Sequence, residues 1–179
     1  MVRWLYRIYI AARSAFYTLL ARRIFASVGR GTVFEGHFEV PLYNEVKIGE
    51  SCLISRGVSF IVTETGRIQL GSRIYIGRDC VLASDAGIVI GDNTMLAEFV
   101  SIIDSDHDTV KNGIPIRDQE LIPRPVTIGA DVWVGRGCAV LKGISIGEGA
   151  VVGANSVVTK DIPPFGVAYG CPARVVRYR

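Results

Sequence analysis

Residues 126–147 read VTIGADVWVGRGCAVLKGISIG, and in this stretch an aliphatic side chain returns at every sixth position. Glycine directly follows several of these residues, which neither a helical period nor simple strand alternation requires. Self-similarity at a six-residue period predicts a parallel β-helix. The series comprises Ile128, Val134, Val140, Ile146, Val152 and Val158, and the same spacing occurs earlier at Ile48, Ile54 and Phe60 and at Leu70, Ile76, Leu82 and Ile88.

A longer period accompanies the six-residue one. A tetrad of aliphatic-x-aliphatic-Gly starts at positions 46, 68, 88, 126 and 144. The step from 126 to 144 equals three six-residue units, which make one coil of a three-sided prism. The two steps before 88 are slightly longer and add a small bulge at a corner. The step from 88 to 126 is too long for one coil, and it predicts that a loop of roughly twenty residues leaves the prism between Ile103 and Val126.

Three segments follow from this pattern. A further six-residue series at Val28, Phe34 and Val40 would form the first coil. We therefore expect an N-terminal helix over 1–27, a β-helix domain over 28–163 with an excursion loop at 104–125, and a basic segment without the repeat over 164–179. The expected fold class is an all-β solenoid, a left-handed parallel β-helix with an N-terminal α-helix.

The composition limits the classes of function. With 179 residues the chain is one domain with an appendage, and its net charge of +3 does not argue for nucleic acid as a partner. Cys52, Cys80 and Cys138 each lie four places after a residue of the six-residue series, which predicts buried, reduced packing residues. Unpaired cysteines favour a reducing compartment, so we expect a cytoplasmic protein.

The N-terminal residues contain no glycine or proline and predict a helix with Trp4, Ile8, Ala12, Ala15, Phe16 and Leu19 along one face. Its apolar runs are interrupted by arginine and are too short to span a bilayer. Two interpretations stay open. The helix covers the end of the β-helix, or residues 1–22 lie at the inner face of the cell membrane as an interfacial helix.

His107 is the candidate catalytic residue. It lies in the sequence SIIDSDHD at 101–108, where the repeat breaks and the loop departs. Functional residues concentrate where a regular scaffold gives way to a loop. Three aspartates, Asp104, Asp106 and Asp108, surround this histidine and are expected to fix its tautomer and raise its basicity.

At this point the chain resembles the hexapeptide-repeat acyltransferases of the left-handed β-helix fold, closest to the maltose/galactoside and surface-polysaccharide O-acetyltransferases. The resemblance runs from Ile88 to Arg177. It is carried by the His107 loop and by the stretches PVTIGADVWVG at 125–135, GISIG at 143–147, GANSVVTKDIPP at 153–164 and GCPARVVR at 170–177.

The resemblance implies a trimer whose active sites lie between subunits, with acetyl-CoA as the acyl donor and no metal. His107 would be the general base that takes a proton from an acceptor hydroxyl. The acceptor would be a sugar or a surface-polysaccharide precursor, to which the acetyl group passes directly.

The same resemblance implies positions for the cofactor. Trp133 would line the pantetheine tunnel with Gly135 and Arg136 at the next corner, and the backbone of Ala154 would bind the pantetheine amides. Thr159 and Lys160 would meet the adenine or phosphate end, and Arg174 and Arg177 would pair with phosphates. Arginine forks match phosphate oxygens, which agrees with that last role.

The acceptor side departs from the family pattern. Sugar acetyltransferases carry an asparagine in the coil before the histidine loop, but here that coil reads IGRDCVLASD at 76–85. Arg78 stands in its place, and Asp85 matches an acidic position near the acceptor. We expect Arg78, Asp85 and Asp106 to contact the acceptor.

Three alternatives to sugar O-acetylation are considered, of which the first two remain. One is N-acetylation of an amino-sugar or another small amine, and another is a non-catalytic β-helix scaffold. The third is a γ-type carbonic anhydrase, which needs three histidine-type zinc ligands. The chain has only His37 and His107, so it lacks these ligands.

Overall fold

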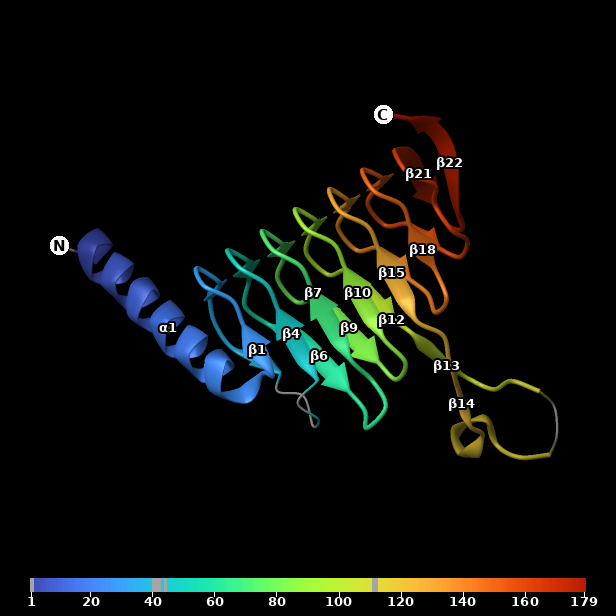
Figure 1. The fold of residues 1–179 in the computed structure, drawn as a ribbon, viewed down its shortest axis with the longest axis horizontal. Helices are drawn as coiled ribbons and strands as arrows, with labels where there is room; N and C mark the ends of the chain where they lie inside the picture. Colours follow the sequence, from blue (N-terminus) through green and yellow to red (C-terminus); the bar gives the residue numbers. More distant parts are fainter. Residues whose placement is uncertain (1, 40–42, 44, 111–112) are drawn as a thin grey trace.

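A three-sided prism of parallel strands makes up most of the molecule in the computed structural model, which describes residues 2–39, 43, 45–110 and 113–179 (Figure 1). Each coil contributes one short strand to each of three sheets, and each strand pairs with its counterparts in the neighbouring coils. We name these sheets A, B and C in the order in which the chain passes through them. Their junctions are the A–B, B–C and C–A corners.

The three sheets take their strands in regular succession. Sheet A contains β1 (Ser27–Val28), β4 (Val46–Ile48), β7 (Ile68–Leu70), β10 (Ile88–Ile90), β15 (Val126–Ile128) and β18 (Ser145–Ile146). Sheet B contains β2 (Val33–Phe34), β5 (Leu53–Ile54), β8 (Tyr75–Ile76), β11 (Met95–Leu96), β16 (Trp133–Val134), β19 (Val151–Val152), β21 (Gly166–Gly170) and β22 (Ala173–Tyr178). Sheet C contains β3 (Phe38–Glu39), β6 (Val58–Val62), β9 (Val81–Ser84), β12 (Ser101–Ile103), β17 (Ala139–Val140) and β20 (Val157–Val158).

The six-residue series fills the interior of the prism. Val134, Val140 and Val152 are each at most 1% exposed, and Phe34 in the first coil is fully buried. The tetrads also align as the spacing predicts, because Val46 pairs with Ile68, Ile68 with Ile88, and Ile88 with Val126. The β-helix predicted from the sequence is therefore confirmed, although Val40 lies outside the described residues.

The glycine that follows a buried aliphatic residue has a steric cause. A Cβ atom added at Gly129 would lie 2.7 Å from the backbone nitrogen of Glu148 in the next coil. The backbones of successive coils approach so closely at this corner that only glycine fits without displacement.

The N-terminal helix α1 (Val2–Ile24) covers the open end of the prism. Ser14 Oγ donates to the carbonyl oxygen of Phe34, and the Phe34 N–H donates to Thr18 Oγ1, both at 2.9 Å. These side chains satisfy backbone groups of β2, a strand that stands at the edge of its sheet. Just beyond the helix, Phe25 is 4% exposed and stacks on Phe34.

The face of α1 that docks is not the apolar face expected from the sequence. Polar contacts to the prism come from Arg13, Ser14 and Thr18, and the Arg13 Nε–H donates to the carbonyl oxygen of Glu35 at 2.9 Å, while Tyr17 and Ala21 pack against the core on the same side. The expected apolar face is exposed instead, with Phe16 at 60% and Leu19 at 57%. The helix thus covers the prism with one side and leaves a hydrophobic side in solvent.

Variation in coil length is concentrated at the C–A corner. Between β17 and β18 the short segment 141–144 turns this corner, whereas the much longer segment 104–125 connects β12 to β15. Part of that longer segment is an antiparallel β-hairpin of β13 (Ser105–His107) and β14 (Leu121–Pro123), with a short 3-10 helix, η1 (Ile116–Asp118), between them. The expected loop is therefore partly regular structure, and we call residues 104–125 the hairpin arm.

Beyond residue 163 the chain still adds to the prism. β21 pairs in parallel with β19, with Val167 opposite Val151, and β22 then returns antiparallel to β21. The C-terminal segment thereby closes the end of sheet B opposite α1 (Figure 1).

Candidate active site

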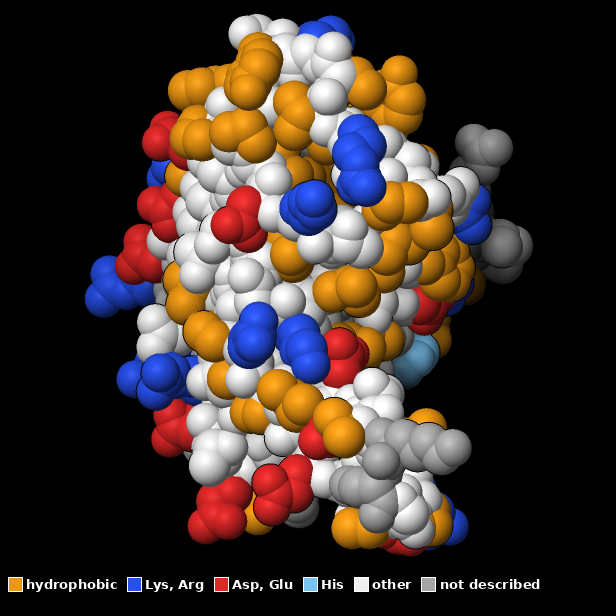
Figure 2. Space-filling model, turned by 90° about the vertical axis from the view of Figure 1, so that its right-hand side faces the viewer, with side chains coloured by type: hydrophobic (Ala, Val, Ile, Leu, Met, Phe, Trp, Pro, Cys, Tyr) orange, Lys and Arg blue, Asp and Glu red, His pale blue; other side chains and the backbone are white. Residues whose placement is uncertain are grey.

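His107 is the last residue of β13, at the base of the hairpin arm. Its partner across the hairpin is Leu121, and its side chain is exposed. Figure 2 shows the arm as a protrusion at the bottom of the view, standing out from the body of the prism. The imidazole is therefore held on a short strand but remains open to a bound molecule.

A buried carboxylate fixes the root of the hairpin arm. Asp104 is fully buried and accepts hydrogen bonds from Ser84 Oγ at 2.9 Å and from three backbone N–H groups of the preceding coil. These donors are Asp85 at 2.7 Å, Ala86 at 3.0 Å and Gly87 at 2.6 Å. Charge-assisted hydrogen bonds of this kind are among the stronger ones in proteins. Asp104 therefore anchors the strand that carries His107.

Two further contacts connect β13 to the coils on its two sides. Ser105 Oγ donates to a carboxylate oxygen of Asp85, which connects β13 to the preceding coil. Lys142 Nζ lies 3.4 Å from Asp106 Oδ2 and connects β13 to the following coil. The sequence did not predict that Asp104, Ser105 and Lys142 anchor the arm. The only signal was the polar run that starts where β12 ends.

The expectation that Asp104, Asp106 or Asp108 fixes the tautomer of His107 is wrong within one chain, because each carboxylate has another partner. Asp104 is buried among backbone donors, Asp106 pairs with Lys142, and Asp108 Oδ1 accepts the N–H of Val110 at 2.9 Å. Among the described residues, the His107 imidazole makes no hydrogen bond or ion pair. Alternation along β13 directs the side chains of Asp106 and His107 to opposite faces of the hairpin.

A second group of candidate residues lies on sheet B and at the B–C corner. Trp133 is 50% exposed on the outer surface of β16, between Met95 and Val151 of the neighbouring coils. At the next corner the guanidinium of Arg136 lies over the ring of Phe99, 5.1 Å from its centroid. Sheet C separates this group from His107 within one chain, because His107 follows the far end of that sheet.

Gly135 and Ala154 occupy successive coils of the same corner. A Cβ atom added at Gly135 would lie 2.6 Å from the backbone nitrogen of Ala154, so glycine here keeps the two coils close. Ala154 is exposed, as is the neighbouring Asn155, whose N–H donates to the carbonyl oxygen of Arg136. The corner therefore presents backbone and small side chains at the surface.

The C-terminal candidates form a separate group. Lys160 and Arg174 both line a small depression of about 170 Å³ between the last C–A corner and β22. Thr159 is exposed beside Lys160, and Arg177 lies further along β22, opposite Val167. Among the described residues, neither arginine pairs with a carboxylate. The structure thus brings Lys160 and Arg174 together at one end of the molecule.

Arg78 and Asp85 lie at opposite ends of the same strand of sheet C. Asp85 follows β9 and accepts a hydrogen bond from Ser105 of the hairpin arm. Arg78 precedes β9 at the B–C corner and lines a groove beside α1. Within one chain the structure does not bring Arg78 close to His107.

Three of the cysteines are interior packing residues, as the sequence predicts. Cys52, Cys80 and Cys138 are buried, whereas Cys171 is exposed, and all four are free thiols. Burial raises the pKa of the Cys80 thiol to about 11, and the nearby carboxylates Glu98 and Asp79 act in the same direction. Burial also raises the pKa of Cys138. These thiols are therefore not poised as nucleophiles.

The described part of the chain lacks two other kinds of site. No helix there combines the length and the apolar character needed to cross a bilayer. Nor do the described residues contain a cluster of three or more His, Cys, Asp or Glu side chains arranged to hold a metal ion.

Comparison with known sequences identifies relatives for most of the chain. A family model described as bacterial transferase hexapeptide (six repeats) matches residues 125–160. A probable acetyltransferase of Mycobacterium tuberculosis is 36% identical over 156 residues, which are 85% of this chain and 52% of that protein. A putative lipopolysaccharide biosynthesis O-acetyl transferase of Escherichia coli is 32% identical over 139 residues, covering 74% of this chain and 71% of the relative. The chain thus spans about half the length of the mycobacterial relative.

Solved structures show the same architecture. A maltose O-acetyltransferase from Clostridium difficile superposes with a TM-score of 0.63 at 33% identity, over 88% of this chain and 71% of the other. An N-acyltransferase from Bacillus cereus, solved with dTDP and 3-hydroxybutyryl-CoA, gives a TM-score of 0.79 over 91% and 88% of the two chains. Because the two sequences are only 21% identical, this second similarity shows a shared fold and nothing more.

Proposed function

The chain belongs to the hexapeptide-repeat transferase family, and from this we propose that it transfers an acetyl group from acetyl-CoA to a hydroxyl group of a sugar. The observation that carries the proposal is the placement of His107. It is exposed on a strand that Asp104, Ser105 and Asp106 hold on both sides, at the main interruption of the prism. A base that is fixed yet accessible suits proton abstraction from a bound hydroxyl.

The proposed reaction is a direct transfer. His107 takes the proton of the acceptor hydroxyl as the oxygen attacks the thioester carbonyl carbon. The tetrahedral intermediate then collapses with cleavage of the carbon–sulfur bond. The CoA thiolate leaves and receives the proton from the imidazolium, so the histidine returns to its neutral form. An imidazole is suited to both steps because its ordinary pKa lies near neutral pH.

We further propose that the active site forms between two chains of a trimer. Within one chain the candidate residues divide into two groups at the two edges of sheet C. His107 and Lys160 lie on the C–A side, and Trp133, Arg136 and Ala154 lie on sheet B and the B–C corner. A groove between adjacent prisms would place the B–C corner of one subunit beside the C–A corner of the next. Cyclic assembly creates such heterologous contacts in identical copies.

Acetyl-CoA is proposed to lie along this groove toward the C-terminal end. The pantetheine chain would pass Trp133 and the close-packed turn at Gly135, reaching the backbone at Ala154. The anionic end would meet Thr159, Lys160, Arg174 and Arg177. Support comes from the joint position of Lys160 and Arg174 at one depression, where the one acidic lining residue, Asp161, accepts the N–H of Ser145, and from the absence of an ion pair for either arginine among the described residues. Uncompensated guanidinium groups favour phosphate ligands.

A thiol-release assay tests this function. Wild-type protein is expected to release CoA from acetyl-CoA when the correct free sugar, nucleotide sugar or lipid-linked sugar is supplied. His107→Ala should lose more than about 99% of this rate, given the 10²–10⁴-fold contribution typical of a general base, while acetyl-CoA binding is retained. His37→Ala is the matched control, because His37 is exposed elsewhere on the prism. Near-normal turnover by His107→Ala would refute the assignment of the base.

A further inference from the structure

A groove between α1 and the first coils collects three arginine side chains. It has a volume of about 510 Å³ and runs along the helix toward the B–C corner. Arg13 enters it from the helix, and Arg56 and Arg78 enter it from successive coils. The remaining lining residues are Tyr6, Ile10, Ser14, Val33, Glu35 and Leu53. The groove therefore combines cationic, aromatic and aliphatic surface.

The positive charge of this groove is not neutralised by ion pairs. Among the described residues, no carboxylate lies within ion-pair distance of Arg13, Arg56 or Arg78. Glu35 is the one acidic lining residue, and its carboxylate accepts a hydrogen bond from Ser55 Oγ at 2.9 Å. Three arginines against one glutamate leave a net charge of +2. Guanidinium groups that converge without acidic partners favour a phosphate-bearing ligand.

The three arginines form a column that points toward the candidate active site. The Asp79 N–H donates to the carbonyl oxygen of Arg56 at 3.2 Å, so Arg56 and Arg78 occupy adjacent coils at the same corner. The Phe99 N–H in turn donates to the carbonyl oxygen of Arg78, which places the coil bearing β12 and the hairpin arm directly next. Adjacent strands lie about 4.8 Å apart, so the column spans the space between the helix and the catalytic coil.

The outer face of α1 is suited to a lipid surface. Leu5, Ile8, Phe16 and Leu19 recur at helical spacing and are 47–60% exposed on the side of the helix away from its docking contacts. The sequence from Met1 to Phe34 contains six arginines and no aspartate or glutamate. An exposed apolar stripe with an exclusively basic charge complements a bilayer with anionic headgroups. A second copy of the helix would instead bring like charges together.

We propose that the arginine groove binds the diphosphate of a lipid-linked sugar acceptor whose hydrocarbon chain remains in a bilayer against the outer face of α1. This inference rests on the proposed acetyltransferase function and specifies its acceptor. Arg13, Arg56 and Arg78 hold the diphosphate, and the sugar extends one coil further along the B–C corner, toward Asp85 and the hairpin arm of a neighbouring subunit. The solenoid thereby stands with its helical end on the membrane.

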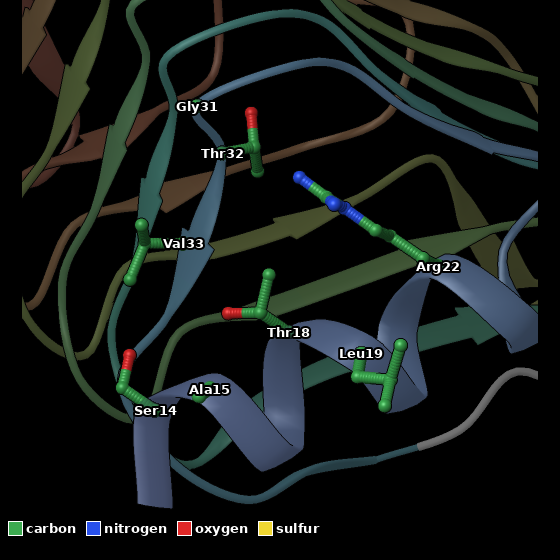
Figure 3. A pocket seen from close by; sticks show the side chains of 8 residues that line it. All are labelled: Ser14, Ala15, Thr18, Leu19, Arg22, Gly31, Thr32 and Val33. Atoms are coloured by element: carbon green, nitrogen blue, oxygen red, sulfur yellow. The ribbon is translucent and has the colours of Figure 1, made fainter. Parts of the chain in front are cut away.

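A second groove beside α1 does not have the same character. It measures about 390 Å³ and is lined by Ser14, Ala15, Thr18, Leu19 and Arg22 of the helix and by residues 31–33 of the first coil. Figure 3 shows Arg22 extending alone across this groove toward Thr32. With one cation and mainly small or apolar neighbours, it offers no site for a diphosphate. The binding experiment below therefore substitutes residues of the first groove, Arg56 and Arg78.

Vesicle flotation with the full chain tests the proposal. Phosphatidylcholine vesicles that contain a minor fraction of polyprenyl diphosphate are compared with vesicles of phosphatidylcholine alone and with vesicles containing phosphatidylglycerol. Wild-type protein should bind the polyprenyl diphosphate vesicles best. Arg56→Ala/Arg78→Ala should weaken this binding about tenfold or more, because the variant loses two charge-assisted contacts and each typically changes the affinity several-fold.

The matched control is Arg30→Ala/Arg73→Ala, which removes the same charge from exposed arginines at the A–B corner. It should change binding to the polyprenyl diphosphate vesicles by less than about twofold, as expected for screened surface charge. Phe16→Glu/Leu19→Glu should abolish attachment to every vesicle while leaving binding of soluble inorganic pyrophosphate intact. Equal losses for the groove variant and the control would overturn the site.

Binding of soluble ligands distinguishes whether the diphosphate belongs to a lipid or to a nucleotide. If a nucleoside diphosphate binds the groove as tightly as the polyprenyl vesicles and Phe16→Glu/Leu19→Glu attaches normally, the lipid assignment is wrong. Equal binding to phosphatidylglycerol vesicles would likewise reject a specific diphosphate site. Acetyl-CoA turnover with soluble sugars is measured separately. Turnover without vesicle binding refutes only this inference, whereas vesicle binding without turnover on any acceptor refutes the proposed function.

Discussion

The carboxylate of Asp104 accepts the backbone N–H of Gly87 at 2.6 Å, although 17 residues separate them in the sequence. This bond and its three companions connect the root of the hairpin arm to the bulge of the preceding coil. The position of His107, three positions further on, therefore depends on a contact between two coils. Regular strand pairing alone would not supply it.

Asp104→Asn should destabilise the protein and reduce turnover. The amide keeps the shape of the side chain but removes the charge and turns one acceptor into a donor facing N–H groups. We expect a loss of about 2–3 kcal/mol in the free energy of unfolding, typical of charge-assisted buried hydrogen bonds. Denaturant unfolding measures this loss. Asp106→Asn is the control and should cost less than about 1 kcal/mol, because its pair with Lys142 is partly exposed.

Asp104 is inferred to position His107 without touching substrate, so kinetics must separate position from general instability. At a temperature where Asp104→Asn is fully folded, kcat should fall while the KM for acetyl-CoA stays near the wild-type value. Unchanged kcat under these conditions would contradict the positioning role.

Mixing two inactive variants tests whether the active site is shared. His107→Ala and Trp133→Ala should each lose activity when expressed alone. When they are coexpressed in equal amounts, about a quarter of the sites in randomly mixed cyclic trimers combine an intact His107 with an intact Trp133. Activity should therefore return to about that fraction of the wild-type rate.

The control for this experiment is the double variant His107→Ala/Trp133→Ala coexpressed with wild-type chains. In these mixed trimers a site is complete only where two wild-type chains meet. The control therefore measures how subunit mixing alone changes the activity. If coexpressed single variants regain no activity although mixed trimers are present, His107 and Trp133 do not meet across a subunit boundary.

Arg174→Ala/Arg177→Ala should raise the KM for acetyl-CoA about tenfold or more, since two phosphate contacts are lost. The KM for the acceptor should stay nearly constant, because β22 lies at the end of the prism opposite α1. Initial-rate kinetics with each substrate varied in turn measure both constants. Arg179→Ala serves as the control, since Arg179 pairs with Asp131 at 3.0 Å. Equal effects on both KM values would reject a phosphate role.

Thiol labelling should distinguish the four cysteines. Cys171 is exposed and should react promptly in the folded protein, whereas Cys52, Cys80 and Cys138 should react only on unfolding. Mass spectrometry of protein labelled before and after denaturation identifies the sites. Rapid labelling of Cys80 in the native state would contradict its buried position and its raised pKa of about 11.

The Cys80 pKa also predicts the direction of an effect on stability. The folded state holds the thiol proton more tightly than the unfolded state, whose ordinary pKa is 9.0. The contribution to the free energy of unfolding is thus fully present below that pH and is lost as pH rises toward about 11. Urea unfolding across this range should show the decline. Cys80→Ala should show a smaller one, and an identical decline would exclude Cys80 as its source.

The solenoid was predictable because its rule is repeated along the chain. Val134, Val140 and Val152 recur at the spacing that returns a side chain to the interior, and Gly129 marks a corner where backbones almost touch. The anchoring role of Asp104 could not be recognised in the same way. Its partners are mainly backbone groups of another coil, which carry no residue-type signal in the sequence.

The position of the acceptor residues shows a second limit. Arg78 is a candidate because the family resemblance implies an asparagine at its position, but its surroundings depend on how α1 docks. That docking uses Arg13, Ser14 and Thr18, whose polar side chains bond the first coil at and beside β2. A helical wheel gives the apolar face as the natural contact. It cannot show that a mixed face, which combines Ser14 and Thr18 with Tyr17 and Ala21, packs on the exposed strand edge instead.

The C–A corner accommodates both the short turn 141–144 between β17 and β18 and the long segment 104–125 between β12 and β15 without disturbing the ladders on either side. Growth at this corner therefore leaves the parallel strand pairing of the scaffold intact, although the root of the arm is bonded to the adjacent coils. A lineage could vary the part of the arm beyond His107 and acquire a new acceptor while the strand ladders stayed unchanged. For the protein engineer, the same corner is a grafting position at which specificity can be rewritten without redesigning a single coil.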